Sequence, residues 1–158
     1  MGERIKGFGY IADGNSRVLI LGSMPSVKSL EAAEYYAHPQ NRFWRVMFSL
    51  FGQEFSIDYG KRVKLLKENG VALWDVIGEC ERDGSGDAAI RAEKVNDIRA
   101  LLSRYKGITR VGANGGKAAE TLGRFFPEIE FTRLPSTSPA NAAVSLQKLI
   151  EAYSEFLF

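Results

Sequence analysis

Short apolar runs alternate with helical patterns along most of this chain, and the alternation limits the folds open to it. Four runs are rich in β-branched and aromatic residues and are flanked by turn residues, which predicts buried strands. They span residues 18–21, 71–74, 108–113 and 129–134. Since strands separated by helices pair in parallel through crossover connections, the sequence predicts an α/β domain with helices on both faces of one sheet.

Between these runs, apolar residues recur at helical spacing. Phe43 and Met47 begin one such stripe, which continues to Phe51, and Gly52 ends the predicted helix. Further helices are expected around Leu65 and Leu66, from Val95 to Tyr105, from Ala119 to Phe126, and from Leu146 to Leu157 with Asn141 as its cap. The pattern predicts a three-layer α/β/α sandwich, with residues 1–158 as a single domain. Segment 79–88 is polar and Gly-rich, which favours a mobile surface loop.

Composition excludes several classes of protein. The net charge of +2 is small, so any contact with nucleic acid needs a local basic patch. Cys80 and His38 are the only residues of their types, which argues against a disulfide, a cysteine zinc site and any other metal site. The N-terminus lacks the apolar core of a signal peptide, and no run is long enough to span a bilayer. We expect a cytoplasmic protein.

Two segments carry candidate chemistry, and each follows a predicted strand. The stretch LGSMPSVKSLEAAEYYAHPQNRFWR, residues 21–45, follows the first strand, and LPSTSPAN, residues 134–141, follows the fourth. Ligands of open α/β sheets bind at the carboxyl ends of the strands, so both segments belong where a site is expected. Aromatic faces and amides suit a flat heterocycle, and a tight Ser/Thr loop suits a phosphodiester.

A third segment resembles a phosphate-binding loop only superficially. In GANGGKA, residues 112–118, the spacing between the glycines is one residue short, and Ala118 has no hydroxyl for magnesium. A turn followed by the N-terminus of a helix is the favoured interpretation, and its free N–H groups could still hold one phosphate.

The segments GSMPS, YYAHPQNRFW, LWDV, NGGKA and LPSTSPAN, in this order, resemble the uracil-DNA glycosylase superfamily. Within it, the chain is most similar to the hypoxanthine-DNA glycosylase (DNA-deoxyinosine glycosylase) family, over nearly its whole length. The resemblance implies a four-stranded parallel sheet and a monofunctional repair enzyme. Such an enzyme hydrolyses the N-glycosidic bond of deaminated bases in double-stranded DNA, chiefly hypoxanthine, with uracil as a second candidate substrate. It implies no cofactor, and we expect a monomer.

The resemblance also implies roles for individual residues. Asn41 matches the asparagine assigned to catalysis, and Tyr36 matches the aromatic residue that stacks on the flipped base. The other base-binding candidates are Gly22, Ser23, Met24 and His38. Candidates for gripping DNA and filling the vacated stack are Ser136, Thr137, Ser138, Pro139 and Ala140, with Lys117 as a phosphate contact.

One departure from the wider superfamily concerns two apolar residues. Relatives that remove uracil carry Asn or Asp at the position of Met24, to orient water, and often His or Asn at the position of Leu134. Both positions are apolar here, which fits the hypoxanthine branch.

Several residues also have structural interpretations. Asn41 could only cap the following helix, and His38 could only hydrogen-bond the loop backbone. Tyr35 and Tyr36 cannot both face one core, so one of them is expected to be free. Phe43 and Trp44 are expected in the core, and Asp75 fits a turn as well as a site.

The whole domain also has an alternative function. It could be a non-catalytic module that binds damaged bases or nucleotides on the same fold. The absence of a polar side chain at Met24 is the feature that keeps this alternative open.

Overall fold

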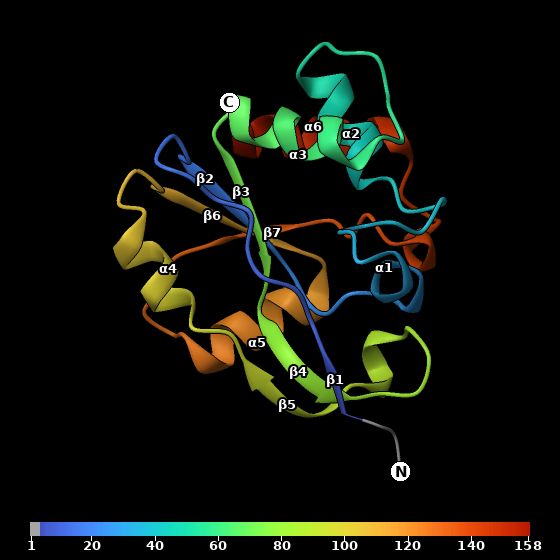
Figure 1. Cartoon of the computed structure of the whole chain (residues 1–158), viewed down its shortest axis with the longest axis vertical. Coiled ribbons are helices and arrows are strands. Elements are labelled where there is room, and N and C mark those ends of the chain that lie inside the picture. Colours follow the sequence, from blue (N-terminus) through green and yellow to red (C-terminus); the bar gives the residue numbers. More distant parts are fainter. Residues whose placement is uncertain (1–3) are drawn as a thin grey trace.

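The computed structural model describes residues 4–158, and a four-stranded parallel sheet lies at its centre (Figure 1). The strand order is β3-β2-β6-β7. The strands are β2 (Val18–Gly22), β3 (Val71–Asp75), β6 (Arg110–Asn114) and β7 (Thr132–Leu134). The predicted parallel sheet is confirmed, although β6 and β7 begin two and three residues later than the apolar runs from which they were predicted.

Helices cover both faces of this sheet, as the alternation predicted (Figure 1). One face packs against α2 (Phe43–Leu50), α3 (Tyr59–Glu68) and α6 (Leu146–Leu157), and the other against α4 (Ile98–Arg104) and α5 (Gly116–Phe125). Successive side chains of a strand point to opposite faces. Ile20 therefore joins the first core and Leu21 the second.

Two predicted helix starts were wrong. Val95 ends a strand, and α4 begins only after Asp97, whose side chain accepts a hydrogen bond from the Ala100 N–H at 3.0 Å. The cap of α6 is Ser145, whose Oγ accepts from the Lys148 N–H at 3.2 Å. Asn141 instead lies in a short 3₁₀ turn, Pro139–Asn141.

A second, antiparallel sheet was not predicted. It consists of β1 (Arg4–Lys6), β4 (Ile77–Glu81) and β5 (Arg91–Val95), in the order β1-β4-β5. The prediction of a loop was therefore wrong for residues 79–81, which belong to β4. Cys80 is buried there and packs with Ile77 and Ile90 in a small third core, which explains why this polar segment is held as a strand.

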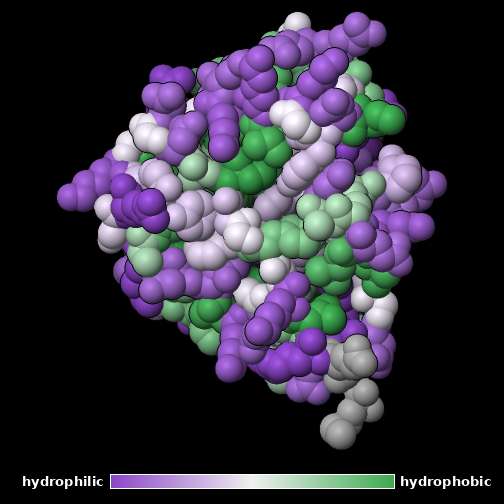
Figure 2. All heavy atoms as spheres, in the orientation of Figure 1, coloured by the Kyte–Doolittle hydropathy of each residue, from purple (hydrophilic) through white to green (hydrophobic). Residues whose placement is uncertain are grey.

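Hydrophilic side chains cover much of the face shown in Figure 2, and hydrophobic residues appear there in separate patches. Within residues 4–158, no helix combines the length and the apolar character needed to cross a membrane.

Candidate active site

The carboxyl ends of the parallel strands meet at one edge of the sheet, and a cavity of about 90 Å³ opens there. The register aligns Gly22 with Asp75 and Asn114 with Leu134, so four strand ends reach the same level. The lining comes from residues 22–26, Ser29, Tyr35, Tyr36, Asn41, Asp75, Ser85, Asp87, Asn114 and residues 136–138. Both candidate segments thus meet in one cavity.

Gly22 lets two oxygen atoms approach the end of β2. A Cβ atom at Gly22 would lie 2.4 Å from Asp75 Oδ1 and 2.7 Å from the Tyr36 hydroxyl. Contacts this short are not tolerated, so any other residue at position 22 would displace one of these groups. The carboxyl and the phenol are therefore neighbours across the backbone of the glycine.

Tyr36 presents an aromatic ring to the cavity. The ring stacks on Phe43 with centroids 4.3 Å apart and an angle of 25° between the planes. Its backbone has a φ of 53°, in the left-handed region that residues other than glycine seldom adopt. Burial raises the pKa of the Tyr36 phenol the most, and the nearby Asp75 raises it further, so the phenol stays neutral. Tyr35 is buried, at 3% exposure, and the partly buried Tyr36 packs against the same core, so the expectation that the two could not face one core was wrong.

Asn114 connects Tyr36 to the loop after β7. Its Nδ2 donates to the Tyr36 hydroxyl at 3.2 Å and to Thr137 Oγ1 at 3.0 Å. Its Oδ1 accepts from the Thr137 N–H at 3.0 Å. Because Asn114 donates to the Tyr36 oxygen, the phenol's own proton is left to donate elsewhere.

Arg42 and Asn141 hold the rest of that loop in place. The Arg42 backbone N–H donates to the Thr137 carbonyl at 3.0 Å, and its guanidinium donates to the carbonyl groups of Asn141 and Val144. The Asn141 amide in turn donates to the Ser136 carbonyl at 2.9 Å. Sequence analysis gave neither residue a role in supporting the site.

Asn41 lies at the cavity and also supports the start of α2. Its Oδ1 accepts a hydrogen bond from the Phe43 N–H at 2.9 Å. The N-cap of α2 is Arg42 rather than Asn41, so Asn41 supports the first N–H of the helix from the position before the cap. An amide oxygen has two lone pairs, however, so Oδ1 retains one acceptor position and Nδ2 can still donate.

Asp75 is the unexpected component of the site. It ends β3, is 4% exposed, and its Oδ2 has no hydrogen-bond partner among residues 4–158. Burial is the largest cause that raises the pKa of Asp75, and the charge of Asp87 is the second. Arg82 acts in the opposite direction, and the resulting pKa is about 7. Sequence analysis left Asp75 undecided between a turn and a site. Its position as the first charged residue after a buried strand, at the ligand edge, was the available signal.

Two residues at the start of η1 (Asp87–Ala89) and just before it, Ser85 and Asp87, also line the cavity. Ser23 Oγ donates to Asp87 Oδ1 at 2.8 Å. The first N–H of α1 (Val27–Ala32) donates to Ser85 Oγ at 2.8 Å. Met24 lines the cavity beside them, but its side chain is 7% exposed and packs in the third core.

Four candidate residues lie outside the cavity lining. His38 supports its own loop, because its Nδ1 accepts from the Gln40 N–H at 3.1 Å. Lys117 lies on the first turn of α5, and its Nζ is 4.0 Å from Glu93 Oε1. Pro139 and Ala140 form the turn beyond Ser138, and Ala140 lines a neighbouring hollow.

The rim of the site contains one basic residue that sequence analysis missed. Arg133 is exposed on β7 and lines the hollow next to the cavity. A Cβ at Gly116 would lie 2.9 Å from its guanidinium, so Arg133 stands at the N-terminus of α5. The predicted turn and helix N-terminus at residues 112–118 are confirmed, since α5 begins at Gly116.

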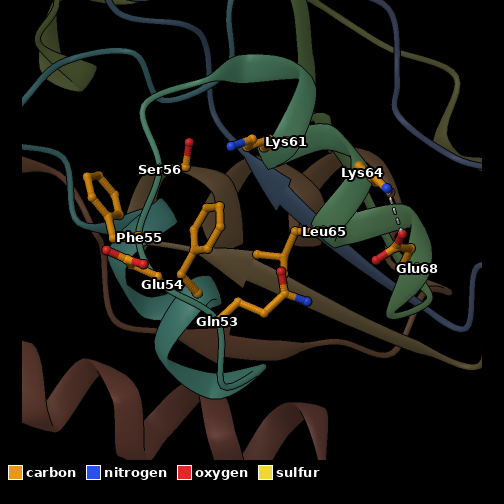
Figure 3. Close-up of a pocket in the computed structure, with 9 residues that line it drawn as sticks. Gln53, Glu54, Phe55, Ser56, Lys61, Lys64, Leu65 and Glu68 are labelled. Atoms are coloured by element: carbon orange, nitrogen blue, oxygen red, sulfur yellow. Dashed lines mark ion pairs between the residues drawn. The ribbon is translucent and has the colours of Figure 1, made fainter.

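A larger hollow lies elsewhere, between α2 and α3 (Figure 3). It measures about 670 Å³ and has exposed polar residues along its wall, including the ion pair of Lys64 with Glu68 at 3.6 Å. None of the buried unpaired polar atoms found in residues 4–158 lines it. In the same residues, no group of three or more His, Cys, Asp or Glu side chains could hold a metal ion.

Comparison with known proteins identifies one family that the chain is similar to. The family model described as "Uracil DNA glycosylase superfamily" matches residues 8–157. A hypoxanthine DNA glycosylase of Methanosarcina acetivorans is 36% identical over 146 residues, which cover 89% of this chain and 90% of the relative. A hypoxanthine DNA glycosylase of Methanosarcina barkeri is 38% identical over 116 residues, which cover 73% of each chain.

A solved structure shows the same fold. It is a solution NMR structure of a Methanosarcina acetivorans protein provisionally named a uracil DNA glycosylase. The TM-score is 0.80 at 34% identity, and the match covers 99% of this chain and all of the other.

Proposed function

The chain belongs to the uracil DNA glycosylase superfamily, and on that premise we propose that it excises hypoxanthine from double-stranded DNA. The reaction is hydrolysis of the N-glycosidic bond of the deaminated nucleotide. We propose further that the 158 residues act as one domain, as a cytoplasmic monomer, with water as the only co-reactant. The proposal rests above all on the meeting of Tyr36, Asn41 and the loop at residues 136–138, which are distant in sequence, in one cavity.

The target base leaves the duplex before the reaction. Rotating a nucleotide out of the stack costs a few kcal/mol, and least for a damaged or mispaired base. One face of the Tyr36 ring already stacks on Phe43, so a base on the other face would extend the stack. Stacking of a base on an aromatic residue contributes about 1–3 kcal/mol, which is comparable to the cost of flipping.

Asn41 holds the attacking water. An amide oxygen is far too weak a base to deprotonate water, so its contribution is positioning. The hydrogen bond from Phe43 N–H to Asn41 Oδ1 fixes the orientation of the amide and leaves one acceptor position for water. In this account the hydrogen bond to Phe43 and the catalytic role of Asn41 are compatible.

The loop at residues 136–140 holds the DNA backbone and fills the space that the base leaves. Its serine and threonine side chains are small, and Asn114, Arg42 and Asn141 hold its backbone. A preorganised loop loses little conformational entropy on binding. No lysine lines the cavity of the described chain, so strand cleavage through a Schiff base is not expected.

The test uses a duplex with one deoxyinosine, followed by alkali to reveal abasic sites. We expect cleavage after alkali with the parent protein. Asn41→Ala should lower the single-turnover rate by roughly 10²-fold or more, the scale of one preoriented polar group. The competing function, a non-catalytic binding module, predicts retention of the duplex without any alkali-labile product.

A further inference from the structure

Asp75 is a buried acid to which neither the proposed mechanism nor the hydrogen-bond network gives a role. It is the only acidic side chain among the buried residues of the described chain. A buried polar atom without a partner costs free energy, and native proteins seldom leave one unless it serves a ligand or a reaction. Asp75 Oδ2 is such an atom, and Asp75 lines the cavity.

The position of Asp75 places its carboxyl near the base. It ends β3 and lines the cavity, and its Oδ1 faces the same point above Gly22 as the Tyr36 hydroxyl. A flipped nucleotide enters such a pocket with its base foremost and its sugar toward the mouth. A base stacked on Tyr36 would therefore have Asp75 at its edge.

The surroundings of Asp75 raise its pKa, so the carboxyl holds its proton up to about pH 7. Desolvation disfavours the carboxylate, and the like charge of Asp87 raises the pKa further. The positive charge of Arg82 lowers the pKa but only partly offsets these two effects. The remaining titratable groups that face Asp75 are Tyr35 and Tyr36, and both are neutral. The resulting pKa of about 7 suits a group that must give up a proton near pH 7.

The following inference rests on the proposed function. We propose that Asp75 is a catalytic residue that protonates the departing base. As the bond between C1′ and the base nitrogen breaks, its electron pair moves onto the base, and the Asp75 proton passes to a ring nitrogen or carbonyl oxygen of the base. Water held by Asn41 adds to C1′ and releases one proton. That proton restores the carboxyl, so the products are the neutral base and an abasic sugar.

The opposite role, an ionised Asp75 that stabilises the cationic sugar, predicts the opposite pH dependence. A carboxylate at the edge of the base would repel the negative charge that the leaving group acquires. Under our proposal the rate falls as pH rises through about 7, because the acid form disappears. Under the alternative the rate rises over the same range.

The experiment measures single-turnover excision from a deoxyinosine duplex between pH 5.5 and 9 for three proteins. For the parent we expect a plateau at low pH and a fall of about tenfold per pH unit above the midpoint. Asp75→Asn should excise the base at least tenfold more slowly at pH 6, and its rate should not fall as pH rises through about 7. Asp87→Asn leaves Asp75 in place and removes its like-charged neighbour, so the midpoint should move to lower pH.

The two ideas fail in distinguishable ways. A parent that excises no hypoxanthine at any pH overturns the proposed function and the role of Asp75 with it. An active parent with a flat or rising profile, or an Asp75→Asn variant that retains the fall, overturns the role of Asp75 alone. If Asp75→Asn does not fold, an unchanged midpoint in Asp87→Asn still overturns it.

Discussion

The buried carboxyl of Asp75 should make the stability of the protein depend on pH in a way that one substitution removes. The folded protein holds the proton up to a pKa of about 7, whereas the unfolded chain releases it near 3.8. The stabilisation is therefore fully present below pH 3.8 and is lost as pH rises through 7. Asp75→Asn is neutral throughout and has no such loss.

The magnitude follows from the shift of about three pKa units. Each unit is worth about 1.4 kcal/mol, so the full loss is about 4 kcal/mol. Between pH 5 and pH 8 the difference in unfolding free energy between parent and variant should change by about 2–3 kcal/mol in favour of Asp75→Asn. Comparing the two pH values cancels any packing difference between Asp and Asn that does not depend on pH.

Urea unfolding at pH 5 and pH 8 measures this change. With an m value of about 1–3 kcal/mol/M, the gap between the two midpoints should change by about 1 M or more. Asp83→Asn is a matched control, because the Asp83 side chain is 78% exposed and should show no comparable change. Parallel pH dependence of the parent and Asp75→Asn would refute the reasoning.

Three further substitutions test the supports of the site. Gly22→Ala places a Cβ 2.4 Å from Asp75 Oδ1, so single-turnover excision should fall by roughly 10²-fold, and an active variant would contradict the packing around Gly22. Asn114→Ala leaves the buried Thr137 N–H unpaired, so the free energy of unfolding in urea should fall by about 1–3 kcal/mol. An unchanged urea midpoint would contradict this role of Asn114. Arg133→Ala should weaken DNA binding and reduce the slope of log K against log salt by about one; an unaltered slope would exclude a phosphate contact.

The parallel sheet could be predicted from sequence because its strands carry their own signal. Residues 18–21 and 71–74 are apolar on both faces, as strands covered by helices must be. The antiparallel sheet carries no such signal. β5, with the sequence RAEKV, is mostly exposed and charged, and its pairing with β4 depends on the tertiary fold rather than on local pattern.

Only those residues of the site that belong to local sequence motifs could be predicted. Motifs identified Tyr36, Asn41 and the loop at residues 136–138, and the structure brings these into one cavity. Asp75 required knowledge of burial and of an absent hydrogen-bond partner, which no one-dimensional pattern contains. The roles of Arg42 and Asn141 depend on contacts between segments about 100 residues apart, which sequence periodicity cannot show.

The most direct test of the central claim is to count both products of a single turnover on a deoxyinosine duplex. Free base and abasic sites are quantified in the same reaction, and strand integrity is measured before alkali is added. A monofunctional glycosylase predicts one free hypoxanthine for each abasic site, with the strand intact until alkali. Binding of the duplex with neither product, or strand scission before alkali, would contradict the account.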